Sequence, residues 1–482
     1  MSEATTIINP PKLGIFTKLA YATSGIPVMI EQRGISAFLL IFYNQVIGLP
    51  AHMVAFVLMI SSIFDALCDP AVGQWTDNAE SRFGRRHPFI YIAIVPFAVG
   101  YFLLWVPPVG WSDFSTAVYL LMTLLFLRTF STFFELPSSA LLPELTRDYD
   151  ERTTIVSLRT MFSIVGGMVM TLLAYKVFLK ENPDGTGGIL AHDGYFSYGL
   201  TAALVMAVVM LFSSVSTHHR IPYLSKPPKR KVGIKIILRE LRETISNRSF
   251  VALLAVGMLM STANGARLAL ELYFGLYFWE LTQNQLSILL IAGLVGIVPG
   301  AALATWVSSK IGKRRLVGMA LIGGIAGNVG PVLLRLVGVM PENGSGILFS
   351  ILLVDVTITF CFATMTSIMI TSMMNDVVED VEVKTGRRSE GVLLAADSLF
   401  RKMVASIGIF VSGVMLTVID FPEHAERGGV APDVIAKLAY GYVPITIFYI
   451  SAFFLLSFYQ IDRKSHERNL EILQKRAEGN KA

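Results

Sequence analysis

Two acidic side chains, Asp65 and Asp69, lie in the middle of an apolar stretch, residues 51 to 78, that is long enough to cross a bilayer. They are one helical turn apart, so they share a face of the predicted helix. A lipid-exposed Asp at mid-helix costs roughly 2.5 to 3.5 kcal/mol, so a pair with no basic residue in its segment requires a protein cavity, protons or a cation. The pair therefore indicates ion-coupled transport.

Composition also indicates a membrane protein. Of the 482 residues, 53% are hydrophobic and only 16% are charged, and the mean hydropathy is +0.59, unlike an ordinary soluble domain. Apolar segments of near-bilayer length predict an all-α membrane protein with twelve transmembrane helices. Most of the 40 Lys and Arg residues lie in the terminal segments and the even-numbered loops, which predicts that both termini are cytoplasmic. The net charge of +5 then describes contact with anionic lipid headgroups, and we expect no nucleic-acid partner.

The apolar pattern breaks once, in a basic and proline-containing stretch near the middle of the chain. This break predicts an N-terminal six-helix bundle (1–217), a cytoplasmic basic linker (218–249), a C-terminal six-helix bundle (250–461) and a cytoplasmic tail (462–482). Apolar residues at helical spacing within 234–245 predict either a helix lying on the inner leaflet or a solvated linker.

A short repeat supports two related halves. The sequence SRFGRR at 81–86 recurs as SKIGKR at 309–314, an offset of nearly half the chain, which is typical of parallel repeats in transporters. Its Gly permits a tight turn, and its basic residues can pair with helix C-terminal carbonyls or with acidic groups of a neighbouring helix. The alternative is a positive-inside anchor with no further role. The candidate gating residues are Gly73, Asp77, Arg82, Gly84, Arg85, Arg86, Gly312 and Arg314.

These motifs carry a family resemblance. Gly73, Asp77 and the basic turn resemble the signature of the major facilitator superfamily between its second and third helices. Within that superfamily, FDALCDP at 64–70 followed by SRFGRRHP at 81–88 resembles the melibiose-permease-like glycoside/pentoside/hexuronide:cation symporters. The likeness continues through ELP at 135–137 and spans nearly the whole chain. It implies the major facilitator fold and symport by alternating access.

The resemblance adds Thr132 and Lys402 to the two carboxylates as the cation site. The alternative is that a basic residue on another helix neutralises Asp65 and Asp69 purely for packing. The coupling ion is H⁺ or Na⁺, with no other cofactor, and no bound metal is expected beyond Na⁺ at this site. Cys68 stands where a sodium-binding relative offers an amide oxygen, and sulfur is a poor sodium ligand, so we favour protons.

The family places a sugar-binding carboxylate at Glu135 and an assisting Arg at Arg159. Further intramembrane charges suit an anionic solute such as a hexuronide, although ion pairs between them could use them up; for Arg267 with Glu271 we favour such a pair. Ser138 and Ser139 stand where the sugar-binding relatives carry an aromatic platform, so a surface for sugar stacking is lost. The family resemblance also implies an alternative substrate, a non-sugar organic anion or an amphiphile such as a lysolipid, because some relatives move lysolipids. The candidate substrate residues are Glu31, Arg33, Arg128, Glu135, Arg159 and Arg267.

Enzymatic function is not expected. The seven His residues form no metal-type spacing, and no G-x-S-x-G motif occurs. We expect an integral protein of a bacterial inner (plasma) membrane, surrounded by lipid, that functions as a monomer with a small-molecule substrate and a monovalent cation as its partners.

Overall fold

The computed structural model describes residues 13–79, 81–146, 148–181, 187–223, 247–385 and 390–479. Over these ranges the regular structure is helical, apart from one isolated bridge between Glu181 and Gly187. The chain forms two compact units, Met1–Arg230 and Lys231–Ala482. The boundary falls inside the predicted linker, whose residues 224–246 lie outside the described ranges, as does the proposed surface helix. The predicted domain limits stay a prediction.

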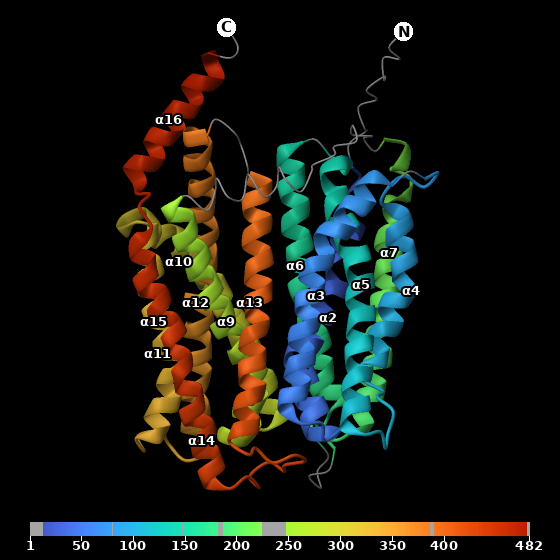
Figure 1. Ribbon diagram of the computed structural model, residues 1–482, viewed down its shortest axis with the longest axis vertical. Helices are drawn as coiled ribbons and strands as arrows, with labels where there is room; N and C mark the ends of the chain where they lie inside the picture. Colours follow the sequence, from blue (N-terminus) through green and yellow to red (C-terminus); the bar gives the residue numbers. More distant parts are fainter. Residues whose placement is uncertain are drawn as a thin grey trace. The chain divides into compact units, whose positions relative to one another are not determined.

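The N-terminal unit contains seven described α-helices (Figure 1). They are α1 (Ile15–Ala22), α2 (Gly25–Gly34), α3 (Ala51–Asn78), α4 (His87–Leu103), α5 (Asp113–Leu145), α6 (Tyr149–Leu173) and α7 (Asp193–His218). Short π-helical stretches follow α2, at Ile35–Leu39 and Phe42–Val46, and α6, at Ala174–Phe178. A 3₁₀ turn, Ile221–Tyr223, ends the unit's described part.

The C-terminal unit is also built from α-helices with short π-helical and 3₁₀ stretches. Its described helices are α9 (Arg248–Tyr273), α10 (Gln283–Ile311), α11 (Lys313–Leu336), α12 (Gly346–Thr385), α13 (Glu390–Val418), α14 (Pro432–Tyr442), α15 (Thr446–Leu455) and α16 (Arg463–Gly479). A π-helical stretch, Phe274–Phe278, extends α9, and 3₁₀ turns at Val443–Ile445 and Leu456–Phe458 flank α15.

Ten described helices are long and apolar enough to cross a membrane. Two of the twelve predicted segments look different. The first is broken between α1 and α2, where Pro27 cannot donate a hydrogen bond to the carbonyl of Thr23. The third is α4, an apolar helix of only 17 residues that begins with Pro88 in its first turn. The number of spans therefore stays a prediction.

Close helix contacts position the polar residues of the N-terminal unit. Helix α3 packs along α5, and α2 packs along α6. At the second contact, a Cβ added to Gly167 of α6 would lie 2.4 Å from Met29 Cγ, which only glycine avoids. The close approach fixes α2 and with it Glu31, two residues beyond Met29.

Candidate ion and substrate site

The predicted carboxylate pair converges on one hydroxyl. Asp65 is buried, with 4% of its surface exposed, and Asp69 is half-buried one turn further along α3. The Thr132 hydroxyl of α5 lies 3.2 Å from Asp65 Oδ1 and 3.3 Å from Asp69 Oδ1. A hydroxyl carries one proton, so it can donate to only one of these carboxylates at a time. The Thr132 hydroxyl therefore links the two carboxylates, as expected from their spacing on α3 and from the family resemblance at Thr132.

A second acidic group lies beside this pair. Glu31 of α2 is fully buried, and its Oε1 accepts a hydrogen bond of 2.8 Å from Arg128 Nη1. Its Oε2 accepts a hydrogen bond of 2.6 Å from the Ser131 hydroxyl. The same Arg128 nitrogen lies 3.9 Å from Asp65 Oδ2, so the guanidinium links the two acidic groups. Glu31 and Arg128, both predicted to contact substrate, thus form an internal ion pair.

The cluster is rich in acidic groups. Its described contacts join three carboxylates, those of Glu31, Asp65 and Asp69, through one guanidinium and two hydroxyl groups. Closely spaced carboxylates repel one another when all are ionised, and burial increases that cost. Closely spaced carboxylates relieve it by taking up a proton or binding a cation. The cluster can therefore act as an ion-binding site.

The remaining predicted substrate residues lie in separate places. Glu135 and Arg33 are half-buried, and Arg33 lies about 200° around α2 from Glu31. The Arg159 guanidinium of α6 lies 6.0 Å from the centre of the Tyr21 ring. Arg267 of α9 pairs with Glu271 one turn along at 3.5 Å, the ion pair that the sequence favoured.

Lys402 lies on α13 in the other unit and is half-buried. Asp65 and Asp69 belong to the N-terminal unit, so the predicted contact of Lys402 with them would be a contact between the two units. It stays a prediction.

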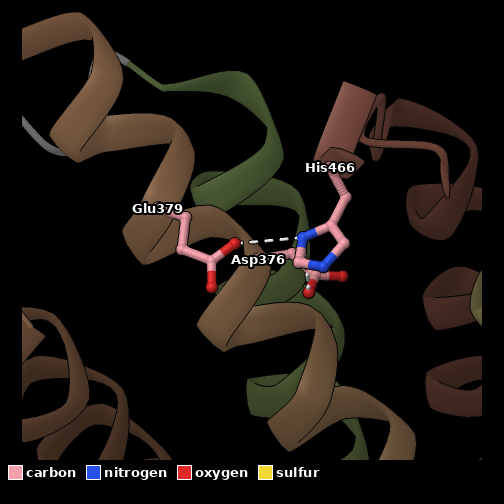
Figure 2. A group of neighbouring side chains, drawn as sticks. All are labelled: Asp376, Glu379 and His466. Carbon is pink, nitrogen blue, oxygen red and sulfur yellow. Dashed lines mark ion pairs between the residues drawn. The ribbon is translucent and has the colours of Figure 1, made fainter. Parts of the chain in front are cut away.

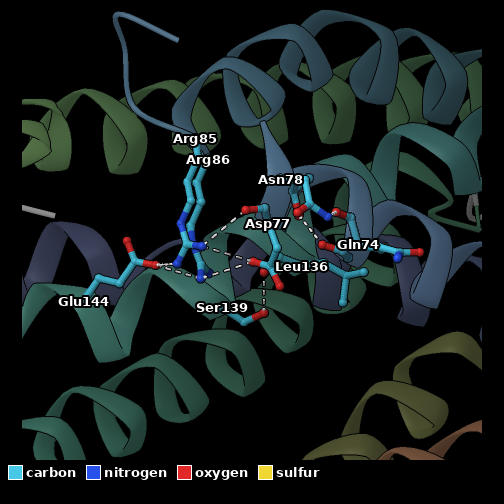
Figure 3. Close-up of polar contacts among 10 residues, drawn as sticks. Gln74, Asp77, Asn78, Arg85, Arg86, Leu136, Ser139 and Glu144 are labelled. Carbon is cyan, nitrogen blue, oxygen red and sulfur yellow. Dashed lines mark hydrogen bonds and ion pairs between the residues drawn. The ribbon is translucent and has the colours of Figure 1, made fainter. Parts of the chain in front are cut away.

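The basic turn of the N-terminal unit contacts two acidic groups (Figure 3). Arg85 and Arg86 both pair with Glu144 near the end of α5, and the contact from Arg86 is 2.7 Å. Each guanidinium also lies 3.6 to 3.7 Å from Asp77 at the end of α3. Burial lowers the pKa of Arg86, and Glu144 opposes that shift. Gly84 makes the turn possible with a φ of +76°.

Two other predicted gating residues of this turn make no contact with those acids. The Arg82 guanidinium lies over the ring of its neighbour Phe83, 4.8 Å from the centroid. Gly73 lies inside α3 facing open space.

In the second copy of the turn, a glycine with positive φ again lies directly before a basic residue that pairs with an acid. Gly312 has a φ of +87°, and Lys313 donates to both carboxylate oxygens of Asp376 on α12, at 2.7 and 2.8 Å. Arg314 donates to the carbonyl of Tyr459 at 3.4 Å. In both units the turn after one long helix contacts an acid near the C-terminal end of another long helix.

Sequence reasoning did not assign roles to three of these partners: Ser131, Glu144 and Asp376. The sequence could have identified Ser131 as a site residue, because it lies directly before Thr132 and three residues after Arg128. The sequence could also have identified Glu144 and Asp376, since each is an acid near the predicted cytoplasmic end of a segment, on the same side of the membrane as a basic turn. Only packing shows which basic residue each of them meets.

Long apolar helices with a buried polar cluster are typical of membrane transporters, and the comparison with known families gives that class and not an enzyme. Residues 20–463 match the family model of MFS/sugar transport proteins, so the chain belongs to this family of the major facilitator superfamily. It is an integral membrane protein.

Among curated proteins, the isoprimeverose transporter of Lactiplantibacillus pentosus is 24% identical over 99% of this chain and 95% of its own length. The sodium-dependent lysophosphatidylcholine symporter 1 of Gallus gallus is 24% identical over 96% of this chain and 90% of its own length. Among solved structures, a bacterial homologue of the human lysosomal transporter Spinster, inward-facing and unoccupied, aligns with a TM-score of 0.65 at 12% identity over 93% of this chain and 98% of that chain. This last likeness concerns the fold.

Proposed function

We propose that this protein is a secondary active transporter that couples the movement of H⁺ or Na⁺ to uptake of a sugar, glycoside or hexuronide by alternating access. One observation carries the proposal: the Thr132 hydroxyl lies within 3.3 Å of carboxylate oxygens from both Asp65 and Asp69 at mid-membrane. Ion occupancy would neutralise a carboxylate of the pair and allow the polar cluster to pass through states that exclude water. In this scheme Lys402 approaches the carboxylates from the other unit and supports or replaces the ion.

The ion is proposed to be a proton. The thiol of Cys68, which directly precedes Asp69, is a poor ligand for a sodium ion. A carboxylate pair that shares one hydroxyl can take up a single proton without additional ligands. The sodium-dependent relative keeps Na⁺ as the competing ion.

The solute is proposed to contact Glu135, Arg159 and Arg33. The pairing of Glu31 with Arg128 removes one guanidinium from the set available to an anionic sugar. Similarity to the isoprimeverose transporter supports a glycoside as the solute, and similarity to the lysophosphatidylcholine symporter supports an amphiphile as the alternative solute. We further propose twelve spans in two six-helix bundles, cytoplasmic termini, a location in the plasma membrane and function as a monomer.

The test uses purified protein reconstituted in lipid vesicles. Radiolabelled isoprimeverose, a β-glucuronide and lysophosphatidylcholine are each offered under an inward pH gradient, an inward Na⁺ gradient or no gradient. We expect concentrative uptake of a sugar or glucuronide driven by the pH gradient. Uptake that follows only Na⁺ would reject the proton, and accumulation of lysophosphatidylcholine alone would select the amphiphile. Uptake that never exceeds equilibration under any gradient would reject symport.

A further inference from the structure

Three side chains with metal-ligating atoms converge beside the basic turn of the C-terminal unit (Figure 2). Asp376 and Glu379 lie one turn apart on α12, and His466 lies in the first turn of α16. His466 Nδ1 is 3.0 Å from Glu379 Oε2 and 3.5 Å from Asp376 Oδ1. The three donor atoms all lie within 4.8 Å of one another.

Two of these donor atoms are buried without a hydrogen-bond partner in the described part of the chain. His466 Nδ1 and Glu379 Oε2 are both inaccessible to solvent, and within the described part of the chain neither has a hydrogen-bond partner. They are close enough for a mutual hydrogen bond, yet their angles do not allow one. Buried polar atoms are normally satisfied, so an unsatisfied pair that converges on a third ligand calls for an explanation. A shared cation supplies one.

The distances suit a small divalent ion. Bonds of 2.0 to 2.2 Å in a tetrahedral Zn²⁺ site place neighbouring ligand atoms about 3.4 Å apart. The observed 3.0 and 3.5 Å lie on either side of that value. One imidazole and two carboxylates form a nitrogen and oxygen donor set that Zn²⁺ accepts, with water as the fourth ligand.

The surroundings hold these ligands in place. The Tyr459 hydroxyl donates to Asp376 Oδ2 at 3.3 Å, as outer partners of ligating carboxylates do. Helix α16 is fastened to α12 by two further contacts. Asn469 Nδ2 donates to Asp380 Oδ1 at 3.4 Å, and Arg476 Nη1 donates to the carbonyl of Val383 at 3.0 Å. His466 therefore faces α12 in a defined position.

We propose that Asp376, Glu379 and His466 bind a divalent transition-metal ion of the Zn²⁺ type, which fastens α16 to α12 beside the turn that contains Lys313. Lys313 already donates to both oxygens of Asp376, so a bound ion shares that carboxylate with the ammonium group and weakens its hold on the turn. The site lies outside the proposed ion and solute pathway. The competing explanation is a protonated His466 that simply pairs with both carboxylates.

The experiment measures metal binding by the full-length protein, purified in detergent without a polyhistidine tag and freed of metal with a chelator. Zn²⁺ affinity is measured by competition with a chromogenic chelator, and Co²⁺ absorption reports the ligand geometry. His466→Asn and Glu379→Gln remove one ligand each. Two matched controls make the same chemical changes elsewhere: His424→Asn in an exposed loop and Glu382→Gln one turn along α12. His424 has a φ of +53°, which Asn tolerates.

We expect one Zn²⁺ per chain, an affinity at least about tenfold weaker in His466→Asn and Glu379→Gln, and no change in either control. Size-exclusion profiles that match the wild type show that the variants are folded, and if one variant fails this check the other decides. Absence of saturable binding by the wild type would overturn the proposal and leave the protonated ion pair. Equal affinities in wild type and His466→Asn, or equal losses in His424→Asn, would also overturn it. None of these outcomes depends on transport.

Discussion

In the N-terminal unit the turn between α3 and α4 places Arg85 and Arg86 against Glu144, and in the C-terminal unit the turn between α10 and α11 places Lys313 against Asp376. The acid in each case lies near the C-terminal end of a long helix two positions further along the chain. The two turns therefore share a glycine with positive φ and a mode of contact, although residues 79–86 separate α3 from α4 and Gly312 alone separates α10 from α11. They differ in charge, since the second unit uses a single ammonium group in place of two guanidinium groups.

The preceding helices differ far more. At the repeat offset, the positions of Asp65 and Asp69 on α3 correspond to Gly293 and Ile297 on α10. A Cβ at Gly293 would lie 3.1 Å from the Phe360 ring, so α10 uses this position for packing against α12. The comparison shows that the structural turn is present in both halves, whereas the carboxylate pair belongs to one half.

The largest expected effect is on coupling. Replacing Asp65 and Asp69 together by Asn removes both titratable groups, and we expect ion-driven accumulation in vesicles to fall by at least about 100-fold, a loss of about 2.7 kcal/mol. The matched control is Asp355→Asn, which removes a half-buried intramembrane carboxylate from α12 of the other unit. We expect this control to keep coupled uptake. Coupling that survives the double change, or that is lost equally in Asp355→Asn, would contradict coupling through the carboxylate pair of α3.

The second effect is on stability and compares two intramembrane arginines. Arg128→Met leaves Glu31 buried and unpaired, which should cost about 3 to 5 kcal/mol. Arg267→Met breaks a longer pair with a half-exposed Glu271, which should cost less than about 1 kcal/mol. Thermal unfolding in detergent should therefore show a drop of about 3 to 5 °C for the first variant and about 1 °C or less for the second. Similar decreases in unfolding temperature would show that the two ion pairs contribute equally to stability, against this prediction.

The third effect compares the acids at the two turns. Glu144→Gln leaves two guanidinium groups, 8% and 15% exposed, with only the distant and exposed Asp77. Asp376→Asn leaves one ammonium group that is 33% exposed and better solvated. We expect losses of about 2 and about 1 kcal/mol of unfolding free energy respectively, by the same thermal measurement. A larger loss in Asp376→Asn would mean that the second turn depends more on its acid than the first.

The last effect concerns the glycine in each turn. Gly84→Ala and Gly312→Ala each place a side chain at a positive φ that glycine adopts readily and other residues rarely do, which should cost about 1 to 2 kcal/mol in either unit. At Gly312 the added Cβ would meet open space, so the cost there comes from backbone strain alone. Gly324→Ala, inside α11 and also facing open space, serves as the control and should lose nothing. Unequal losses of unfolding free energy in Gly84→Ala and Gly312→Ala would show that the two turns differ in backbone strain.

Much of the fold and part of the site could be predicted from residue patterns. Long apolar segments predicted membrane helices because backbone polar groups in a bilayer must be satisfied within the chain. The spacing of Asp65 and Asp69 predicted a shared face, and the structure shows both carboxylates at the Thr132 hydroxyl. Thr132 itself came from family resemblance, since periodicity cannot identify which residue of α5 faces α3. The break between α1 and α2 was not predicted, although Pro27 offered a reason for it.

The sequence by itself determined where charge enters the membrane and where the chain turns, because both depend on residue type and short spacing. Only the tertiary structure decided which charges meet. It paired Arg128 with Glu31 across 97 residues, Arg86 with Glu144, and Lys313 with Asp376, and it brought His466 to α12. Such pairs depend on the rotation and depth of each packed helix. Those quantities are set by close contacts such as that of Gly167 with Met29, which leave little trace in any one segment.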